Sequence, residues 1–293
     1  MLSVERVLLL LFLTMLPLAA SAQTLNTTKI DQALGRSGQK TGDVYKLGFP
    51  RTDLHVSVHG LAIRSGLALG SWAAFTGTDD NAMVMGDLVL LEDEVNPVLD
   101  HLRSSGFEIT AIHNHLTGET PQVLYMHYMG HGPAAQLAGS LKAALAVSKT
   151  PLEKPAAPSE EPAPPAWARS VEDAVGRKGA FKGGILSYGV ARADEITMSG
   201  MTIAPAAGVA ESINFQAADS GNVATTGDFV LTASEVNPVI TELRTHHIFV
   251  TALHSHMLTE QPRLFFMHFW AVGTPESVGG GIKAALSRVS VKQ

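Results

Sequence analysis

The sequence has no cysteine and no strongly basic tract, and both absences narrow what the protein can do. Without cysteine there are no disulfides, thiolate zinc fingers, iron–sulfur clusters or cysteine nucleophiles. A bound transition metal must therefore be held by imidazole and carboxylate groups. Lysine and arginine number 21 against 27 aspartates and glutamates, giving a formal charge of −6, so nucleic acid is not an expected partner.

The chain does contain enough apolar material for a folded protein. Its 293 residues are 45% hydrophobic, which excludes wholesale disorder, and the length is that of about two domains. Among the polar residues there are 12 histidines.

Residues 1–22 have the pattern of a secretory signal peptide. Arg6 supplies a positive charge, residues 7–18 form an apolar run, and Ala20-Ser21-Ala22 is a small-residue cleavage site. A membrane anchor is the alternative, but the run is shorter than the ~20 apolar residues that a span needs. We expect cleavage after Ala22 and an exported protein, periplasmic or secreted, with no transmembrane segment.

The rest of the chain is an internal duplication at a spacing of 141 residues. Over the 60 positions from Gly86 to Leu145, 25 are identical without a gap to residues 227–286. Between the copies, residues 149–167 are rich in proline and form a linker that cannot pack a core. The predicted domains are therefore residues 24–148 and residues 168–293.

Each copy predicts an α+β fold with a mixed or antiparallel sheet and flanking helices, in a unit of about 120 residues. In the first copy, the alternating residues 54–59 and the apolar residues 82–91 predict strands. Asn96 as N-cap and Pro97 at the first helical position predict a helix that Gly106 ends. Strands over residues 109–116 and 123–128 then form a hairpin, and a helix over residues 134–146 closes the unit.

Histidines on the predicted hairpin are the strongest candidates for chemistry. The first copy has the spacing HxH-x3-E-x7-H, and the second copy repeats it. Alternate residues of a strand share a face, and a turn near Pro121 brings the third histidine opposite the first two. Three imidazoles with an open position are typical of catalytic zinc, although iron, copper, nickel or manganese would also fit. We predict a divalent transition metal, zinc above all, held by His113, His115 and His127 and by His254, His256 and His268.

A hydrogen-bonded histidine cluster that ties the hairpin together is the alternative interpretation. A single histidine on a strand is usually a surface residue or a satisfied polar group. The same four residue types recur in both copies while neighbours such as Asn114 and Ser255 differ, which favours a metal.

Four glutamates near these histidines are candidate catalytic residues. Glu119 and Glu260 lie in the predicted turns, and Glu94 and Glu235 lie just before the predicted helices. The second pair fits helix capping, since Thr232 with Glu235 matches a capping box. The alternative for that pair is a fourth metal ligand or a general base beside metal-bound water.

Arg51 and Arg192 recur at equivalent positions in the two copies. Structural ion pairs with Asp53 and Asp194 are the favoured explanation. A clamp for an anionic group of a substrate is the alternative.

The strings GDLVLLEDEVNPV, TAIHNHLTGETP, MHYMG and LKAAL resemble the LppY/LpqO-like family, an exported bacterial domain of unknown function. The resemblance covers both copies and implies an exported, duplicated protein without assigning an activity. The namesakes of that family are lipoproteins, whereas this chain has no cysteine to carry a lipid.

The histidine motif is also similar to that of acetolactate decarboxylase-like zinc proteins. There, an HxH pair on one strand and a third histidine after a short turn bind zinc in an α+β fold. In this chain Tyr125-Met126 replace the glycine pair usual before the third histidine. Cupins share the HxH-x3-E motif, but they are all-β barrels and the predicted helices argue against them.

Three functional hypotheses follow. The first is a metal-dependent hydrolase or lyase, in which the metal activates water or polarises a carbonyl group and one of the glutamates moves the proton. The second is a non-catalytic protein of the cell envelope that holds a metal or another ligand between its two units. The third gives the histidines a purely structural role. No nucleophile motif, phosphate loop or dinucleotide fingerprint narrows the substrate class.

Overall fold

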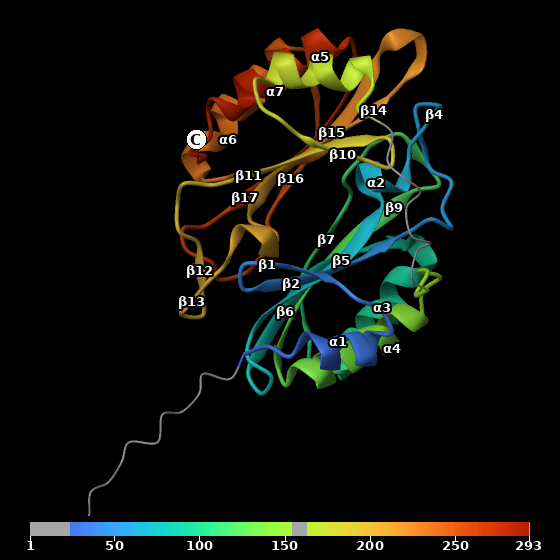
Figure 1. Cartoon of the computed structure of the whole chain (residues 1–293), viewed down its shortest axis with the longest axis vertical. Coiled ribbons are helices and arrows are strands. Elements are labelled where there is room, and N and C mark those ends of the chain that lie inside the picture. Colours follow the sequence, from blue (N-terminus) through green and yellow to red (C-terminus); the bar gives the residue numbers. More distant parts are fainter. Residues whose placement is uncertain (1–23, 154–162, 293) are drawn as a thin grey trace, which may run out of the picture.

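The computed structural model describes residues 24–153 and 163–292. The predicted signal peptide, residues 1–22, and the middle of the predicted linker lie outside the described residues. The described chain forms two similar halves, each with a six-stranded antiparallel sheet and helices on one face (Figure 1). The fold is an α+β tandem duplication, as the sequence predicted.

The sheet of the first half has the strand order β1-β2-β5-β6-β9-β7, and neighbouring strands are antiparallel. A second, three-stranded sheet has the order β4-β3-β8. The elements of this half are α1 (Thr27–Leu34), β1 (Gln39–Thr41), β2 (Val44–Pro50), β3 (Ser57–Val58), β4 (Leu61–Ala62), α2 (Ser65–Ala68), β5 (Gly70–Gly77), β6 (Ala82–Leu91), α3 (Glu92–Ser104), β7 (Glu108–His113), β8 (Glu119–Thr120), β9 (Val123–Gly132) and α4 (Ala134–Ala146).

The second half repeats this arrangement in the order β10-β11-β14-β15-β17-β16. Its elements are α5 (Ala166–Val175), β10 (Ala180–Lys182), β11 (Ile185–Ala191), β12 (Thr197–Met198), β13 (Met201–Thr202), η1 (Pro205–Ala207), β14 (Ala210–Ala217), η2 (Asp219–Gly221), β15 (Val223–Leu231), α6 (Ala233–Thr245), β16 (Phe249–His254), β17 (Phe265–Gly273) and α7 (Pro275–Leu286). In residues 24–153 and 163–292, no helix has the length and apolar character needed to cross a bilayer.

The two sheets face each other, and the long helices cover their outer faces, whereas the short helix α2 lies between the halves and packs against β14 and β15 (Figure 1). One hydrophobic core lies between each sheet and its own helices. Two further buried clusters join the halves, one that includes Met85 and Val209 and one that includes Tyr125 and Trp270. Burial of apolar surface, worth ~25 cal/mol per Å², therefore holds the halves together as well as stabilising each.

Strand β6 is buried along its length except at Leu91. One of its faces packs on the helices of its own half through Val84, and the other packs on the second half through Met85. A strand that is covered on both faces has a continuous run of apolar residues in its sequence. Asp87 is the charged residue within that run, and it is buried too.

The helix predicted to begin at Pro97, with Asn96 as its N-cap, begins at Glu92 instead, so that prediction was wrong and Pro97 lies inside α3. Leu91 is the N-cap, and its backbone N–H donates to the Glu94 carboxylate at 2.9 Å. This contact at the third helical position sets the start of the helix one turn before the proline. In the second half, Thr232 and Glu235 form the predicted capping box.

Residues 54–59 contain only the two-residue strand β3, so the longer strand predicted there was also wrong. The chain turns just before this segment, because the N–H of Thr52 bonds to the Pro50 carbonyl and that of Leu54 bonds to the Arg51 carbonyl. Alternation of apolar residues over a few positions does not separate a strand from such a turn. The initial helices α1 and α5 were not predicted.

Candidate metal centre

The site is built from a row of side chains that crosses neighbouring strands. Asp87 on β6 lies opposite His127 on β9. Asp228 on β15 lies opposite His268 on β17 in the same way. Opposite residues of an antiparallel pair share a face, with Cβ atoms about 5 Å apart. In both halves this is the face turned toward the other half, so carboxylates and imidazoles of the two sheets meet.

The HxH pairs lie at the ends of the edge strands β7 and β16, beside the aspartates and histidines of the central strands. His113 is the last residue of β7, and His115 lies two residues beyond it. The ring of Tyr125 stacks on His115 with 3.3 Å between centroids. The second half repeats this contact with Phe266 stacked on His256 at 3.6 Å. An aromatic ring therefore positions the second histidine of each motif.

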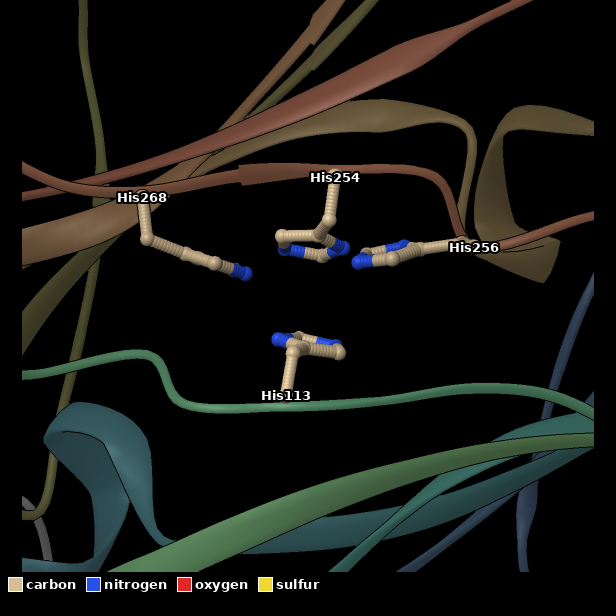
Figure 2. Close-up of side chains that lie close together, drawn as sticks. All are labelled: His113, His254, His256 and His268. Carbon is tan, nitrogen blue, oxygen red and sulfur yellow. The ribbon is translucent and has the colours of Figure 1, made fainter.

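The six predicted ligand histidines form one cluster, because each stacks on a histidine of the other half. The three pairs and their centroid distances are His113 with His254 (3.6 Å), His115 with His268 (3.8 Å) and His127 with His256 (3.6 Å). His113 and His254 are equivalent residues of the two copies. In the other two pairs, the second histidine of one motif stacks on the third histidine of the other motif. This is the pattern of a two-fold axis. Figure 2 shows His113 facing the three histidines of the second half.

Backbone carbonyls determine which ring nitrogen carries the proton. A carbonyl oxygen only accepts, so a ring nitrogen bonded to one is the donor. Nδ1 of His113 donates to the Asn114 carbonyl at 3.1 Å, and Nδ1 of His268 donates to the Gly227 carbonyl at 2.9 Å. In these neutral rings Nε2 therefore keeps its lone pair, as a metal ligand requires.

The Nε2 atoms of all six histidines are buried without a hydrogen-bond partner, and so are one oxygen of Asp87 and one of Asp228. An unsatisfied buried polar group costs about 1–3 kcal/mol. Eight such atoms together would cost on the order of 10 kcal/mol, which is comparable with the whole stability of a typical protein. A cation that pairs with these atoms would remove that penalty.

Asp87 and Asp228 are the carboxylates of the cluster. Asp87 lies 3.8 Å from Nε2 of His115 and 3.8 Å from Nε2 of His127, and Asp228 lies 3.7 Å from Nε2 of His256. These distances are too long for hydrogen bonds. After small shifts, however, one ion placed between these oxygen and nitrogen atoms could bind them with bonds of about 2.0–2.2 Å. Burial raises the pKa of Asp87 to about 8 and raises that of Asp228 well above its ordinary value. A bound cation would hold both in the ionised form.

All six histidines are neutral at pH 7. Burial lowers the pKa of His113 to about 3 and that of His254 to about 4. Burial, together with the neighbouring imidazoles, lowers the pKa of the other four well below the ordinary value. The neutral imidazole is the form that binds a metal.

The ligand atoms gather in two groups, each with its atoms within 4.8 Å of one another. One group contains His113, His254, His256 and His268, and the other contains His113, His115 and His127. His113 belongs to both groups. The geometry therefore makes a single centre to which both halves contribute.

Glu94 lies outside this centre and has a structural role. Its two oxygens accept hydrogen bonds from the Arg51 side chain at 2.7 Å and 3.2 Å and from the N–H groups of Leu91 and Lys149. Arg51 is fully buried and also pairs with Asp53 at 2.9 Å. Arg192 makes the equivalent ion pairs with Asp194 and Glu235. These arginines connect the end of one strand to the start of a helix.

Glu119 and Glu260 stabilise the turns that follow the histidine pairs. Glu119 accepts from the N–H of Val123 at 3.2 Å, and Glu260 accepts from the N–H of Leu264 at 2.9 Å. Neither belongs to the two groups of ligand atoms. The second oxygen of Glu119 is buried without a partner, and burial raises the pKa of this residue to about 7. The second oxygen of Glu260 pairs with Arg263 at 3.3 Å.

A cavity of about 370 Å³ adjoins the centre. Both halves line it, and its wall includes Asp87, Asp228 and the four histidines His115, His127, His256 and His268. A small molecule that entered this cavity would contact the ligand atoms directly.

Asp87 and Asp228 were not predicted from the sequence, and the histidines of the two copies were predicted as two separate sets. A signal for the aspartates was present, because Gly86-Asp87 recurs as Gly227-Asp228 inside an apolar strand. A carboxylate buried at such a position is costly unless it is paired or bound to a metal. No sequence pattern predicts that the two histidine sets meet, since their meeting depends on how the two halves pack.

Comparison with known proteins adds a family but no activity. A family model described as Domain of Unknown Function (DUF1259) matches residues 28–147 and again residues 169–288. No curated protein matches the chain. Among solved structures, the chain is similar to a trimeric bacterial microcompartment shell protein, PduB, at 12% identity over 86% of this chain and 89% of that one, with a TM-score of 0.21. A TM-score this low carries no argument about fold or assembly.

Proposed function

We propose a metal-binding function for this chain, which belongs to the family described as Domain of Unknown Function (DUF1259) and carries its domain twice. The observation that supports it is the convergence of six buried imidazole nitrogens and two carboxylate oxygens that have no partner in the protein. Imidazole and carboxylate ligands suit zinc and similar divalent ions. We propose two ions, one for the histidines and aspartate of each half, in a centre shared through His113.

Metal-dependent catalysis of the hydrolase or lyase class is the use of this centre that the geometry supports best. The adjoining cavity gives a small molecule access to the ligand atoms. A metal ion there would activate water or polarise a carbonyl group. Of the four glutamates singled out in the sequence, Glu119 keeps an unpartnered oxygen and is the candidate for proton transfer.

Non-catalytic metal binding is the second candidate function. It is favoured by the group of His113, His254, His256 and His268, because four imidazoles could close a tetrahedral site and leave no open position. Such a protein would hold a metal in the cell envelope without acting on a substrate. Export of the protein is itself part of our proposal, supported by the pattern of residues 1–22 and by the resemblance to the LppY/LpqO-like family.

Elemental analysis of protein purified without a histidine tag and equilibrated with zinc tests metal binding. We expect about two ions per chain, and a loss of metal in the double variant His113→Ala, His115→Ala. The control is His131→Ala, which removes an exposed histidine of β9 outside the cluster. Protein with no tightly bound metal would overturn the proposal, and unchanged metal in the double variant would exclude the first histidine set.

Cobalt substitution distinguishes the two candidate functions. The visible absorption of bound Co²⁺ depends on its coordination number and ligands. A shift of these bands on addition of azide would show an open position, as a catalytic metal requires. Bands that do not respond to azide would favour the closed, non-catalytic site.

A further inference from the structure

The cavity beside the metal centre is asymmetric, although the metal ligands are related by the duplication. Trp72 lies opposite Asp87 on the neighbouring strand, and the equivalent position opposite Asp228 is Ser212. Both residues line the cavity, where the serine leaves space that the tryptophan fills in the other half. Lys46, also in the wall, has Ser187 as its equivalent in the second copy. The two halves therefore offer different chemistry to a ligand.

Lys46 brings a positive charge into this cavity. The side chain is partly buried, and its Nζ lies 4.1 Å from the centroid of the Trp72 ring. Nζ also donates a long hydrogen bond of 3.4 Å to the Ala206 carbonyl. Asp87 attracts it through space without forming an ion pair. A cation with so few partners in a partly buried place is under-solvated, and an anion beside it would compensate that cost.

Besides the proposed metal ions, the cavity offers one cationic side chain to a ligand. Lys46 is the one lysine or arginine among the lining residues in the described chain, whereas Asp87, Asp228 and Glu211 are acidic. A ligand with a single carboxylate would pair with this one cationic side chain and leave a second oxygen free for the metal ions. The volume of about 370 Å³ is at the lower end of the range for small-molecule sites, so the ligand is small.

We infer that the cavity binds a small organic monoanion, with its carboxylate on Lys46 over the Trp72 ring and a second oxygen directed at the metal centre. This inference rests on the proposed metal-binding function, since the second oxygen needs an ion as its partner. In this inference Lys46 binds the carboxylate end of the ligand and thereby fixes the ligand's orientation in the cavity.

Calorimetric titration of zinc-loaded protein with glycolate, and with its neutral amide glycolamide as the matched probe, tests the inference. We expect glycolate to bind and glycolamide to bind at least about tenfold more weakly. The variant Lys46→Met keeps the aliphatic stem without the charge, and we expect it to lose about tenfold or more in glycolate affinity with glycolamide unaffected. The control is Lys40→Met, an exposed lysine on β1.

Metal content is measured in each sample, so that failure of this inference is distinguishable from failure of the metal centre. Zinc-loaded wild-type protein that does not bind glycolate would overturn the inference, and so would a fully loaded Lys46→Met variant that binds glycolate as tightly as wild type. Tighter, Lys46-dependent binding of inorganic phosphate would overturn the assignment of a carboxylate. Wild-type protein without zinc would instead contradict the proposed function.

Discussion

At the scale of single residues, the centre depends on buried polar atoms that the protein itself does not satisfy. Asp87 is 4% exposed, and its Oδ1 has no hydrogen-bond partner. The histidine rings of the cluster stack on one another, and Nδ1 of His113 and Nδ1 of His268 each donate to a backbone carbonyl, while the Nε2 atoms have no partner. Such positions reduce the stability of the metal-free protein, and under the function that we propose a bound cation would offset this cost.

The substitution Asp87→Asn tests the role of this carboxylate with almost no change in shape. We expect zinc affinity to fall by about 10–100-fold, because the amide is a neutral and weaker ligand. Metal-free protein should be at least as stable as wild type, since a buried ionisable group has been removed. Competition with a zinc-binding dye and thermal unfolding measure the two effects.

The matched control for Asp87→Asn is Asp100→Asn, an exposed aspartate of α3. It should change neither quantity measurably. Unchanged zinc affinity in Asp87→Asn would remove this residue from the ligand set.

At the scale of strands and helices, the repeated Gly-Asp pair combines a close backbone approach with a ligand. A Cβ on Gly86 would lie 2.2 Å from the Trp72 carbonyl oxygen, and one on Gly227 would lie 2.0 Å from the Ser212 carbonyl oxygen. The neighbouring strand therefore lies too close for any side chain at this position. This explains why glycine precedes the aspartate in both halves.

We predict that Gly86→Ala lowers the free energy of unfolding by about 1–3 kcal/mol, because strands β5 and β6 must separate to admit the methyl group. Urea denaturation of metal-free protein measures the change. Gly48→Ala on β2 is the control, since a Cβ there meets no atom within 4 Å. A loss as small in Gly86→Ala as in Gly48→Ala would show that the strand spacing adjusts freely.

Strong local patterns were sufficient to predict several elements. The apolar run 82–91 is β6, and the segment 134–146 is α4, both with the predicted bounds. The start of α3 was predicted wrongly because the proline was taken as the first helical residue, whereas contacts of Glu94 with Leu91 begin the helix earlier. The local sequence is compatible with a helix that starts at Pro97 and with one that starts at Glu92. The ion pair of Glu94 with buried Arg51, a residue distant in sequence, supports the start at Glu92.

At the scale of the whole molecule, the halves pack face to face and bring six neutral imidazoles into one buried cluster. The pKa of each is below its ordinary value because burial disfavours the charged ring. The unfolded chain therefore takes up protons below about pH 6.5 that the folded protein does not. Acid should unfold the metal-free protein cooperatively.

We predict that the stability of metal-free protein is lost as the pH falls from about 6 toward 4, with each histidine contributing up to about 1.4 kcal/mol per pH unit. Four buried carboxyl groups whose pKa is raised oppose this loss, but the six histidines outnumber them: Asp87, Asp228, Glu119 and Glu211. Urea denaturation between pH 7 and pH 5 measures this slope. The double variant His113→Gln, His254→Gln should have a shallower slope by up to two protons, whereas His55→Gln, His131→Gln, which changes two exposed histidines, should keep the slope of wild type. Equal slopes in all three proteins would contradict burial of the cluster.

The sequence by itself determined the duplication, the α+β class and the six histidines as two equivalent sets of three, because these depend on residue types and on spacing along the chain. Only the tertiary structure decided that the two sets form one centre, that Asp87 and Asp228 belong to it, and that Glu94 and Glu235 do not. The physical reason is that apolar surfaces such as those of Met85 and Val209 bring the two sheets together. That packing joins atoms about 141 residues apart, and no local pattern encodes such a distance.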